Sequence, residues 1–137
     1  MSGIETTIFK LLAAHLDTYV QAHPIDVAYP GLSYTPVAGT PFLRPWFLPA
    51  RTISADLNAA NDYTGILQID VFWPAGKGTW DAMDVAAALI AHFPSPSTLY
   101  GDAGFNVRIE DPGYVSPALQ EPGWLHIPVN VPYRVLS

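Results

Sequence analysis

The stretch WLHIPVNVPYRV, residues 124–135, decides the fold more than any other part of this chain. Apolar residues alternate along it with polar residues, prolines and one tryptophan. This period of two is the side-chain period of a β-strand. The pattern therefore predicts one long strand with a single apolar face. The residues of that face are Leu125, Ile127, Val129, Val131, Tyr133 and Val135.

Two prolines lie on the other face of this strand. Pro128 and Pro132 have the same parity, so their main-chain nitrogens point towards the same strand edge. Because proline has no N–H, neither residue can donate a hydrogen bond to a neighbouring strand there. The sequence predicts that this edge is open, bulged or only partly paired. An exposed sheet edge has to be capped, blunted or given a partner.

Hydrophobic periodicity predicts the remaining elements. Two amphipathic helices are expected, over residues 4–22 and 79–93, and proline follows each of them. Further strands are expected over residues 25–29, 42–48, 65–73 and 105–110. The strand over 42–48 is bracketed and interrupted by Pro41, Pro45 and Pro49, which have one parity and again predict an edge without donors. Two segments have little periodicity: Arg51–Asp62 is expected to be a long exposed loop or a hairpin tip, and Asp111–Gly123 a turn-rich connection.

This order of elements predicts an α+β fold. Helix, strands, helix and strands follow one another, which is typical of a largely antiparallel, mixed β-sheet with two α-helices packed on one face. The length of 137 residues is ordinary for a single domain. The sequence has no internal repeat and no second apolar core.

Composition excludes several classes of function. The net charge is −6, and the six Lys and Arg residues are scattered, whereas a nucleic-acid-binding protein needs clustered cations. There is no cysteine, so disulfides and thiolate metal sites are excluded. The longest apolar stretch, Val85–Ala91, is too short to span a membrane, and the N-terminus lacks the order of a secretion signal. Only 13% of the residues are charged, which indicates that part of the surface is buried in an assembly.

One segment resembles a phosphate-binding loop. Gly76–Thr79 lies between a predicted strand and a predicted helix. The full motif needs a glycine six residues before the lysine and a Ser or Thr directly after it, but Val71 and Gly78 occupy those positions. We therefore interpret the segment as a turn followed by a helix N-cap at Thr79, and we predict no cofactor.

No catalytic or metal-binding constellation can be assigned. The four histidines lack metal-ligand spacing and are expected at the surface or in an interface; they are His15, His23, His92 and His126. Asp81 and Asp84 are explained by their position at the start of a helix. The serines lack a nucleophile-elbow context. The prediction is that the chain is not an enzyme and binds no metal.

Tryptophan is abundant, with four residues. Tryptophan is enriched at protein interfaces because it buries a large area and keeps a polar N–H. Trp73 shares the apolar face of its strand and is expected in the core. Trp46 and Trp124 belong to the proline-containing strands, so they are better candidates for an interface.

Several segments, taken in order, resemble the tail terminator-like proteins of long-tailed bacteriophages, of the minor tail protein U type. The resemblance runs from the first helix to the C-terminus and is weakest over Pro94–Gly123. It implies a single tail terminator-like domain over residues 1–137. The segments that carry it are Phe42–Pro45, Phe47–Pro49, Gly65–Val71, Gly76–Gly78, Asp84–Phe93 and Trp124–Arg134.

The resemblance implies a structural role in the virion. Proteins of this kind form a ring, commonly a hexamer, that caps the tail tube, stops its polymerisation and provides the surface for head joining. The expected partners are other copies of the chain, the tail tube protein and the head–tail connector protein, with no nucleic-acid recognition and no membrane. Such a protein is a virion tail component assembled in the bacterial cytoplasm. The residues expected in interfaces are Arg44, Trp46, Arg51, Asp56, Asp62, Trp124, His126 and Arg134.

Two alternatives remain open at this stage. The tryptophans, together with His126 beside Trp124, are compatible with a small ligand-binding domain or an enzyme that uses an aromatic cleft. The chain is also compatible with another phage structural protein, such as a tube subunit or a head–tail joining protein.

Overall fold

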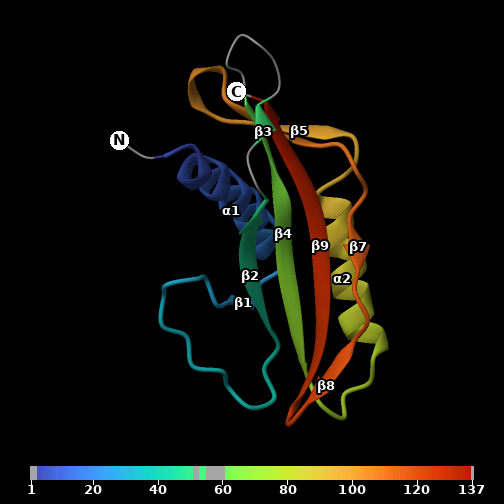
Figure 1. Cartoon of the computed structure of the whole chain (residues 1–137). Helices are drawn as coiled ribbons and strands as arrows, with labels where there is room; N and C mark the ends of the chain where they lie inside the picture. Colours follow the sequence, from blue (N-terminus) through green and yellow to red (C-terminus); the bar gives the residue numbers. More distant parts are fainter. Residues whose placement is uncertain (1–2, 51–52, 55–60, 137) are drawn as a thin grey trace.

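Two long neighbouring strands form the centre of the structure. In a computed structural model, which describes residues 3–50, 53–54 and 61–136, strand β4 (Asn61–Pro74) lies beside strand β9 (Trp124–Leu136). The two are antiparallel and pair along their length, from Asp62 opposite Leu136 to Pro74 opposite Trp124 (Figure 1). The strand predicted from the alternation over residues 124–135 is therefore confirmed.

Shorter strands extend this pair into a mixed sheet. The order is β1-β2-β4-β9-β6-β5, where β1 is Asp26–Val27, β2 is Phe42–Pro49, β6 is Asn106–Ile109 and β5 is Ser97–Tyr100. Three more strands lie off this path: β3 (Ile53–Ser54) pairs with β4, and β7 (Tyr114–Val115) and β8 (Leu119–Glu121) pair with β9. The β1–β2 pair is parallel and the other pairs are antiparallel.

The two prolines of β9 lie where its second edge changes partner. Ser116 N donates to Pro128 O, so the even-numbered residues of β9 direct their main-chain groups away from β4. Along this edge β8 pairs with residues 124–126, β7 with residues 129–130, and β6 with Arg134. Pro128 and Pro132 lie at the two junctions, where no N–H is available for a continuous ladder. The predicted partial pairing is confirmed.

The outer edge of β2 is also short of donors. Ala28 N donates to Leu43 O, so odd-numbered residues of β2 direct their main-chain groups away from β4. Pro45 and Pro49 are odd-numbered, and neither can donate at that edge. Strand β1 pairs only with Phe42 and Leu43. The prediction of a strand with a donor-poor edge is confirmed.

Both helices pack on one face of the sheet, as predicted. Helix α1 (Ile4–Ala22) and helix α2 (Trp80–His92) lie behind the strands in Figure 1. Their apolar side chains meet the odd-numbered side chains of β2, β4 and β9 in the main core. Burial of this shared apolar layer is the main stabilising term for such a fold. Its most buried members include Ile8, Leu12, Leu16, Leu43, Leu67, Ile69, Val71, Ala82, Leu89, Ile127, Val129 and Val131.

Between α2 and β9, the sequence pattern predicted the fewest of the observed strands. Ser97–Tyr100 forms β5, and the segment predicted as a turn-rich connection contains β7 and β8. Strands of two to four residues are too short for an alternation to be recognised. A single turn of 3₁₀-helix, η1 (Asp102–Gly104), connects β5 to β6.

The turn predicted before α2 is present, but the predicted side-chain cap of the helix by Thr79 is not. Gly76 and Gly78 have φ angles of 83° and 82°, which glycine adopts readily, so the turn accounts for both residues. Thr79 is the residue before the helix, yet its side chain makes no capping hydrogen bond; its carbonyl accepts from Met83 N instead.

The hairpin alternative for Arg51–Asp62 fits the described part of that segment. Ile53 lies opposite Asp62 and Ser54 opposite Asn61, which is the pairing of two strands near a hairpin tip. The predicted interface residues Arg51 and Asp56 lie outside the described residues.

Candidate functional site: the open face of the sheet

The face of the sheet opposite the helices gathers four of the six predicted interface residues that the structure describes. Even-numbered side chains of β2, β4 and β9 point to this face, because side chains alternate along a strand. We call it the open face. The residues that define it are Phe42, Arg44, Trp46, Leu48, Gln68, Asp70, Phe72, Trp124, His126 and Asn130.

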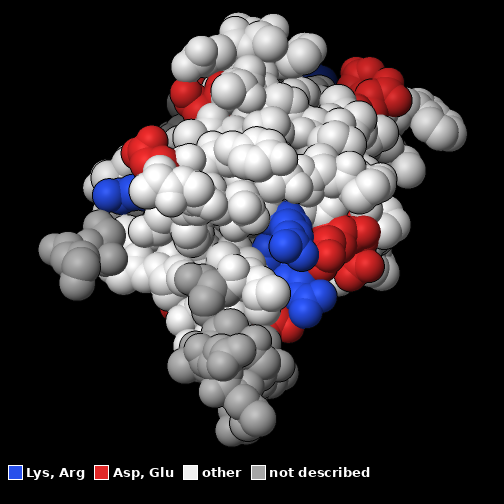
Figure 2. All heavy atoms as spheres, turned by 90° about the horizontal axis from the view of Figure 1, so that it is seen from above, with Lys and Arg blue, Asp and Glu red and all other residues white. Residues whose placement is uncertain are grey.

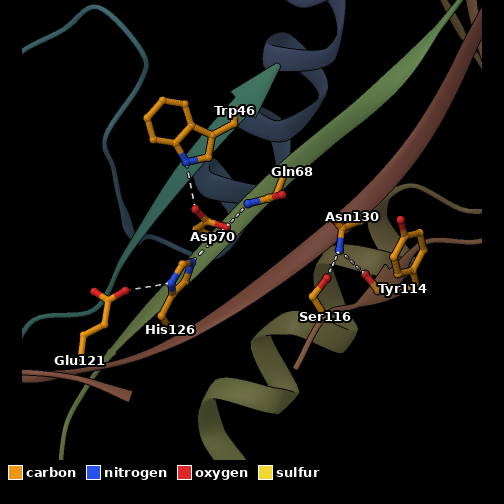
Figure 3. Close-up of polar contacts among 8 residues, drawn as sticks. All are labelled: Trp46, Gln68, Asp70, Tyr114, Ser116, Glu121, His126 and Asn130. Carbon is orange, nitrogen blue, oxygen red and sulfur yellow. Dashed lines mark hydrogen bonds and ion pairs between the residues drawn. The ribbon is translucent and has the colours of Figure 1, made fainter. Parts of the chain in front are cut away.

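A chain of polar contacts crosses the open face (Figure 3). Trp46 Nε1 on β2 donates to Asp70 Oδ2 on β4 over 2.9 Å, and Gln68 Nε2 donates to Asp70 Oδ1 over 2.8 Å. His126 Nε2 on β9 lies 3.1 Å from Asp70 Oδ1, and its Nδ1 lies 3.2 Å from Glu121 Oε1 on β8. Four strands are thereby connected by side chains as well as by their main chains.

The centre of this chain is a buried carboxylate. Asp70 is only 4% exposed, although no helix covers this face. A buried charge is costly unless hydrogen-bond donors surround it, and the indole and amide donors supply that compensation. The arrangement orients Trp46, a residue that remains 42% exposed. An aromatic side chain held in one orientation loses less conformational entropy when a partner covers it.

Aromatic rings surround one end of the open face. Phe42 and Phe72 stack with ring centroids 4.6 Å apart, and Trp124 meets Phe42 edge to face at 5.1 Å. The guanidinium of Arg44 lies 5.5 Å from the Phe42 centroid and 5.6 Å from the Phe72 centroid. These contacts form a small second core, so Trp124 is largely occupied within the chain.

A second polar contact fastens β7 to β9. Asn130 is 5% exposed, and its amide donates to Ser116 Oγ over 2.9 Å and reaches Tyr114 O at 3.5 Å (Figure 3). Between the two junctions at Pro128 and Pro132, the side chain of Asn130 thus adds to the main-chain pairing of β7 with β9.

A charged cluster lies where β4, β6 and β9 meet. Arg134 Nε donates to Asp62 Oδ1 over 2.9 Å, and its Nη1 lies 3.4 Å from Glu110 Oε1. The hydrogen bond to Asp62 raises the pKa of Arg134. Arg108 pairs directly with Arg134 across the strands, and Glu110, 4.0 Å from Arg108 Nη1, lies between the two like charges. Figure 2 shows such a group of basic and acidic side chains on a surface that is otherwise mostly uncharged.

The histidines of the two helices make contacts with each other. His15 Nε2 lies 2.6 Å from His92 O, and His92 Nε2 lies 2.7 Å from His15 O. Their rings stack with centroids 4.2 Å apart. Desolvation by burial lowers the pKa of His92. The pair connects α1 to the end of α2, so these residues have a structural role that their sequence spacing did not suggest.

The open face carries one histidine among its described residues, and the two ring nitrogens of this histidine differ in their surroundings. His126 Nδ1 makes a hydrogen bond with Glu121 Oε1, whereas the buried Nε2 lies 3.1 Å from Asp70 Oδ1 without making a hydrogen bond. Among the described residues, no group of three or more His, Cys, Asp or Glu side chains is placed to hold a metal ion. In the same part of the chain, no helix is long and apolar enough to cross a membrane.

Comparison with known proteins identifies the family. A family model described as phage tail terminator protein matches residues 7–133. The chain belongs to the phage tail terminator family. The match covers α1 from Thr7 onward, all of α2 and the sheet up to Tyr133 of β9, so the resemblance inferred from the sequence motifs is confirmed.

A solved structure agrees with this terminator fold. It has 28% sequence identity and a TM-score of 0.73, and the alignment covers 92% of this chain and 94% of that protein, which carries only a sequence identifier as its name. No curated protein sequence matches the chain. Family membership makes this protein a structural component of a phage tail with a role in tail completion.

The structure groups the predicted interface residues of this terminator in two places. Arg44, Trp46, Trp124 and His126 lie on the open face, and Asp62 and Arg134 form an ion pair in the charged cluster. Sequence reasoning missed Asp70, although one signal was present: it is the only charged residue within the apolar run Ile66–Trp73. Phe72 and Gln68 share its parity and were missed with it.

Proposed function

We propose that copies of this chain form a closed hexameric ring on the end of the tail tube. The ring stops polymerisation of the tube and offers its other side to the head–tail connector protein. It is assembled in the bacterial cytoplasm. The observation that carries this proposal is the family match over residues 7–133. It is supported by a sheet in which, within the described residues, both helices pack on the face opposite the open face.

The exposed apolar side chains and the low charge of the chain support assembly through contacts between subunits. A ring is a closed set of heterologous contacts, so each subunit needs two different patches. Large apolar side chains are exposed in several parts of the chain, and an obligate interface buries on the order of 2,000 Å². The net charge of −6 also disfavours retention of DNA that passes through the ring. The exposed apolar residues include Leu32, Trp46, Leu48, Trp80, Met83, Tyr114 and Leu119.

Deletion of the gene tests the proposed role directly. A phage that lacks it is expected to make tails of uncontrolled length that do not join heads, measured by electron microscopy of lysates. Complementation with the wild-type gene is the control. Tails of normal length after deletion would contradict the proposal, and assembly of the purified protein into long tubes would favour a tube subunit instead.

Trp46→Ala tests the open face as an interface. We expect the variant to fold and to lose ring assembly by about tenfold or more, since exposed, oriented tryptophans are frequent hot spots of binding. Size-exclusion chromatography with light scattering measures the assembly. The matched control is Leu32→Ala, in the loop between β1 and β2. Equal loss of assembly in both variants, or in neither, would count against Trp46 as an interface residue.

A further inference from the structure

Arg44 is a cation on the open face that makes no ion pair with any described residue. Asp70 lies opposite it in the β2–β4 register, but the two oxygens of that carboxylate accept hydrogen bonds from Trp46 and Gln68. The guanidinium of Arg44 lies over the phenyl rings of the small second core instead. A guanidinium that stacks by its face keeps its in-plane N–H groups for a carboxylate. Arg44 is therefore placed to receive an acidic group from another molecule.

A small cavity borders Arg44. It has a volume of about 210 Å³ and lies between β2 and the loop that follows β1. Tyr29, Tyr34 and Trp46 supply aromatic lining, and Leu32 also borders it. Arg44 is the one charged residue among the described residues that line this cavity. The cavity therefore suits an apolar side chain that is accompanied by a carboxylate.

The outward side of α2 carries side chains of that kind. Trp80 is 80% exposed and Met83 is 51% exposed, and Asp84 and Ala87 are exposed as well. Their spacing of i, i+3, i+4 and i+7 places all four on one face of the helix, which we call the outer face of α2. Asp84 makes no ion pair with any described residue. The outer face thus combines two large apolar side chains with one carboxylate.

The cavity and the outer face of α2 lie on opposite sides of the molecule. In Figure 1, the loop between β1 and β2 lies on one side of the β4–β9 pair, and the first turn of α2 lies on the other. The two surfaces are too far apart to meet within one copy, but they can meet between copies. A contact between two different surfaces of the same chain is heterologous, and its repetition closes a ring when the rotation allows.

A competing acidic surface fits this arrangement less well. Asp102 lies near Tyr100, which is 77% exposed, but both residues border α1, which lies on the same side of the sheet as β1 and β2 (Figure 1). Lys10 borders the same place and already supplies a positive charge there. The outer face of α2 is therefore the better partner for Arg44.

We propose that the outer face of α2 of one copy docks on the Arg44 cavity of the next copy. The carboxylate of Asp84 pairs with the guanidinium of Arg44, and the indole of Trp80 covers the cavity. Copies with a net charge of −6 repel one another, and a cation that meets the acidic surface offsets this repulsion at the contact. The inference rests on the proposed function, because it assigns the two surfaces of the ring contact.

Reversal of the two charges tests this contact in the phage that lacks the gene. Arg44→Glu and Asp84→Arg, supplied singly, are each expected to lower the plaque titre by about tenfold or more, because like charges then meet at every contact. Coexpression of the two single variants is expected to restore the titre. An alternating ring brings the two reversed groups together at one contact and the two wild-type groups together at the next.

The same substitutions combined in one chain supply the matched control. Arg44→Glu with Asp84→Arg is expected to restore the titre, whereas Arg44→Glu with Asp102→Arg is not. Wild-type titres from both single variants would overturn the proposal, as would coexpression without recovery. Recovery by Asp102→Arg would also overturn it, since that result places the contact of Arg44 on the competing surface.

Cross-linking tests the contact without a change of either charge. The chain has no cysteine, so Leu32→Cys at the cavity and Ala87→Cys on the outer face introduce the only thiols. Leu32 is 70% exposed, and contacts at the rim of an interface contribute little, so its replacement is tolerated. In infected cells, a short membrane-permeant bismaleimide is expected to join copies with both substitutions into oligomers and a mixture of the two single variants into dimers. Absence of these products would overturn the proposal, as would dimers from one single variant alone, which indicate a symmetric contact.

The two sets of results separate the contact from the proposed function. Normal tails in the deletion phage together with the expected cross-links would mean that the proposed function fails and the contact stands. Tails of uncontrolled length, with neither recovery nor cross-links, would mean that the proposed function stands and the contact fails.

Discussion

Replacement of Gly65 by alanine is expected to lower the free energy of unfolding by about 3 kcal/mol. Gly65 lies opposite Tyr133 in the β4–β9 pair. A Cβ atom at this position would lie 2.4 Å from Tyr133 Oη, 2.6 Å from Tyr133 Cζ and 2.7 Å from Leu48 O. The last of these is a main-chain atom of β2, so the clash cannot be relieved by rotation of a side chain alone.

Chemical or thermal unfolding measures this effect, with a melting temperature roughly 10 °C lower than that of the wild type. Gly101→Ala is the control, because a Cβ there meets its nearest neighbours at 3.5 Å, an ordinary contact distance. Part of the loss is expected to disappear when Gly65→Ala is combined with Tyr133→Leu, which removes the ring. Equal stability of Gly65→Ala and Gly101→Ala would contradict the prediction. It would show that β2 and β9 can move away from residue 65 at little cost in free energy.

Alkaline pH is expected to destabilise the protein because Tyr133 is harder to deprotonate in the folded state than in the unfolded state. Burial raises the pKa of Tyr133 to about 12, with a further contribution from the charge of Glu5. An unfolded tyrosine loses its proton near pH 10, so between about pH 10 and pH 12 only the unfolded chain is deprotonated at this residue. The stabilisation is therefore complete below about pH 10 and is lost as the pH rises through that range. A difference of this size corresponds to about 3 kcal/mol.

Tyr133→Phe isolates this contribution. The variant keeps the ring but has no ionisable group, so its unfolding free energy should fall less between pH 9 and pH 12 than that of the wild type. Urea unfolding at a series of pH values measures the difference. Tyr19 is also buried with a raised pKa, so a smaller dependence remains in the variant. Identical pH profiles of the two proteins would exclude Tyr133 as the source.

Much of the fold was accessible from the sequence because long elements repeat their signal. The alternation over residues 124–135 and the helical stripe from Ile4 each persist over many residues, and both were predicted close to their observed bounds. Short strands such as β7 and β5 offer no such repetition. Their pairing depends on where β9 and β6 lie, which is a tertiary property.

The candidate site was accessible only in part. Trp46 and Trp124 stood out by residue type, but their roles diverge in the structure: Trp46 is exposed and oriented by Asp70, whereas Trp124 packs against Phe42. Spacing along one strand cannot show which residues of three different strands will meet. The contacts of Asp70 follow from the register of β2, β4 and β9.

The sequence by itself determined which edges of the sheet lack donors, because a proline has no N–H wherever it lies and residues of one parity share an edge. It also determined which residues alternate into the apolar layer. Only the tertiary structure decided that the edge prolines of β9 lie at junctions between three short strands and that Asp70 is buried. These features depend on which distant segments lie side by side, and that arrangement is set by packing against the two helices rather than by any local pattern.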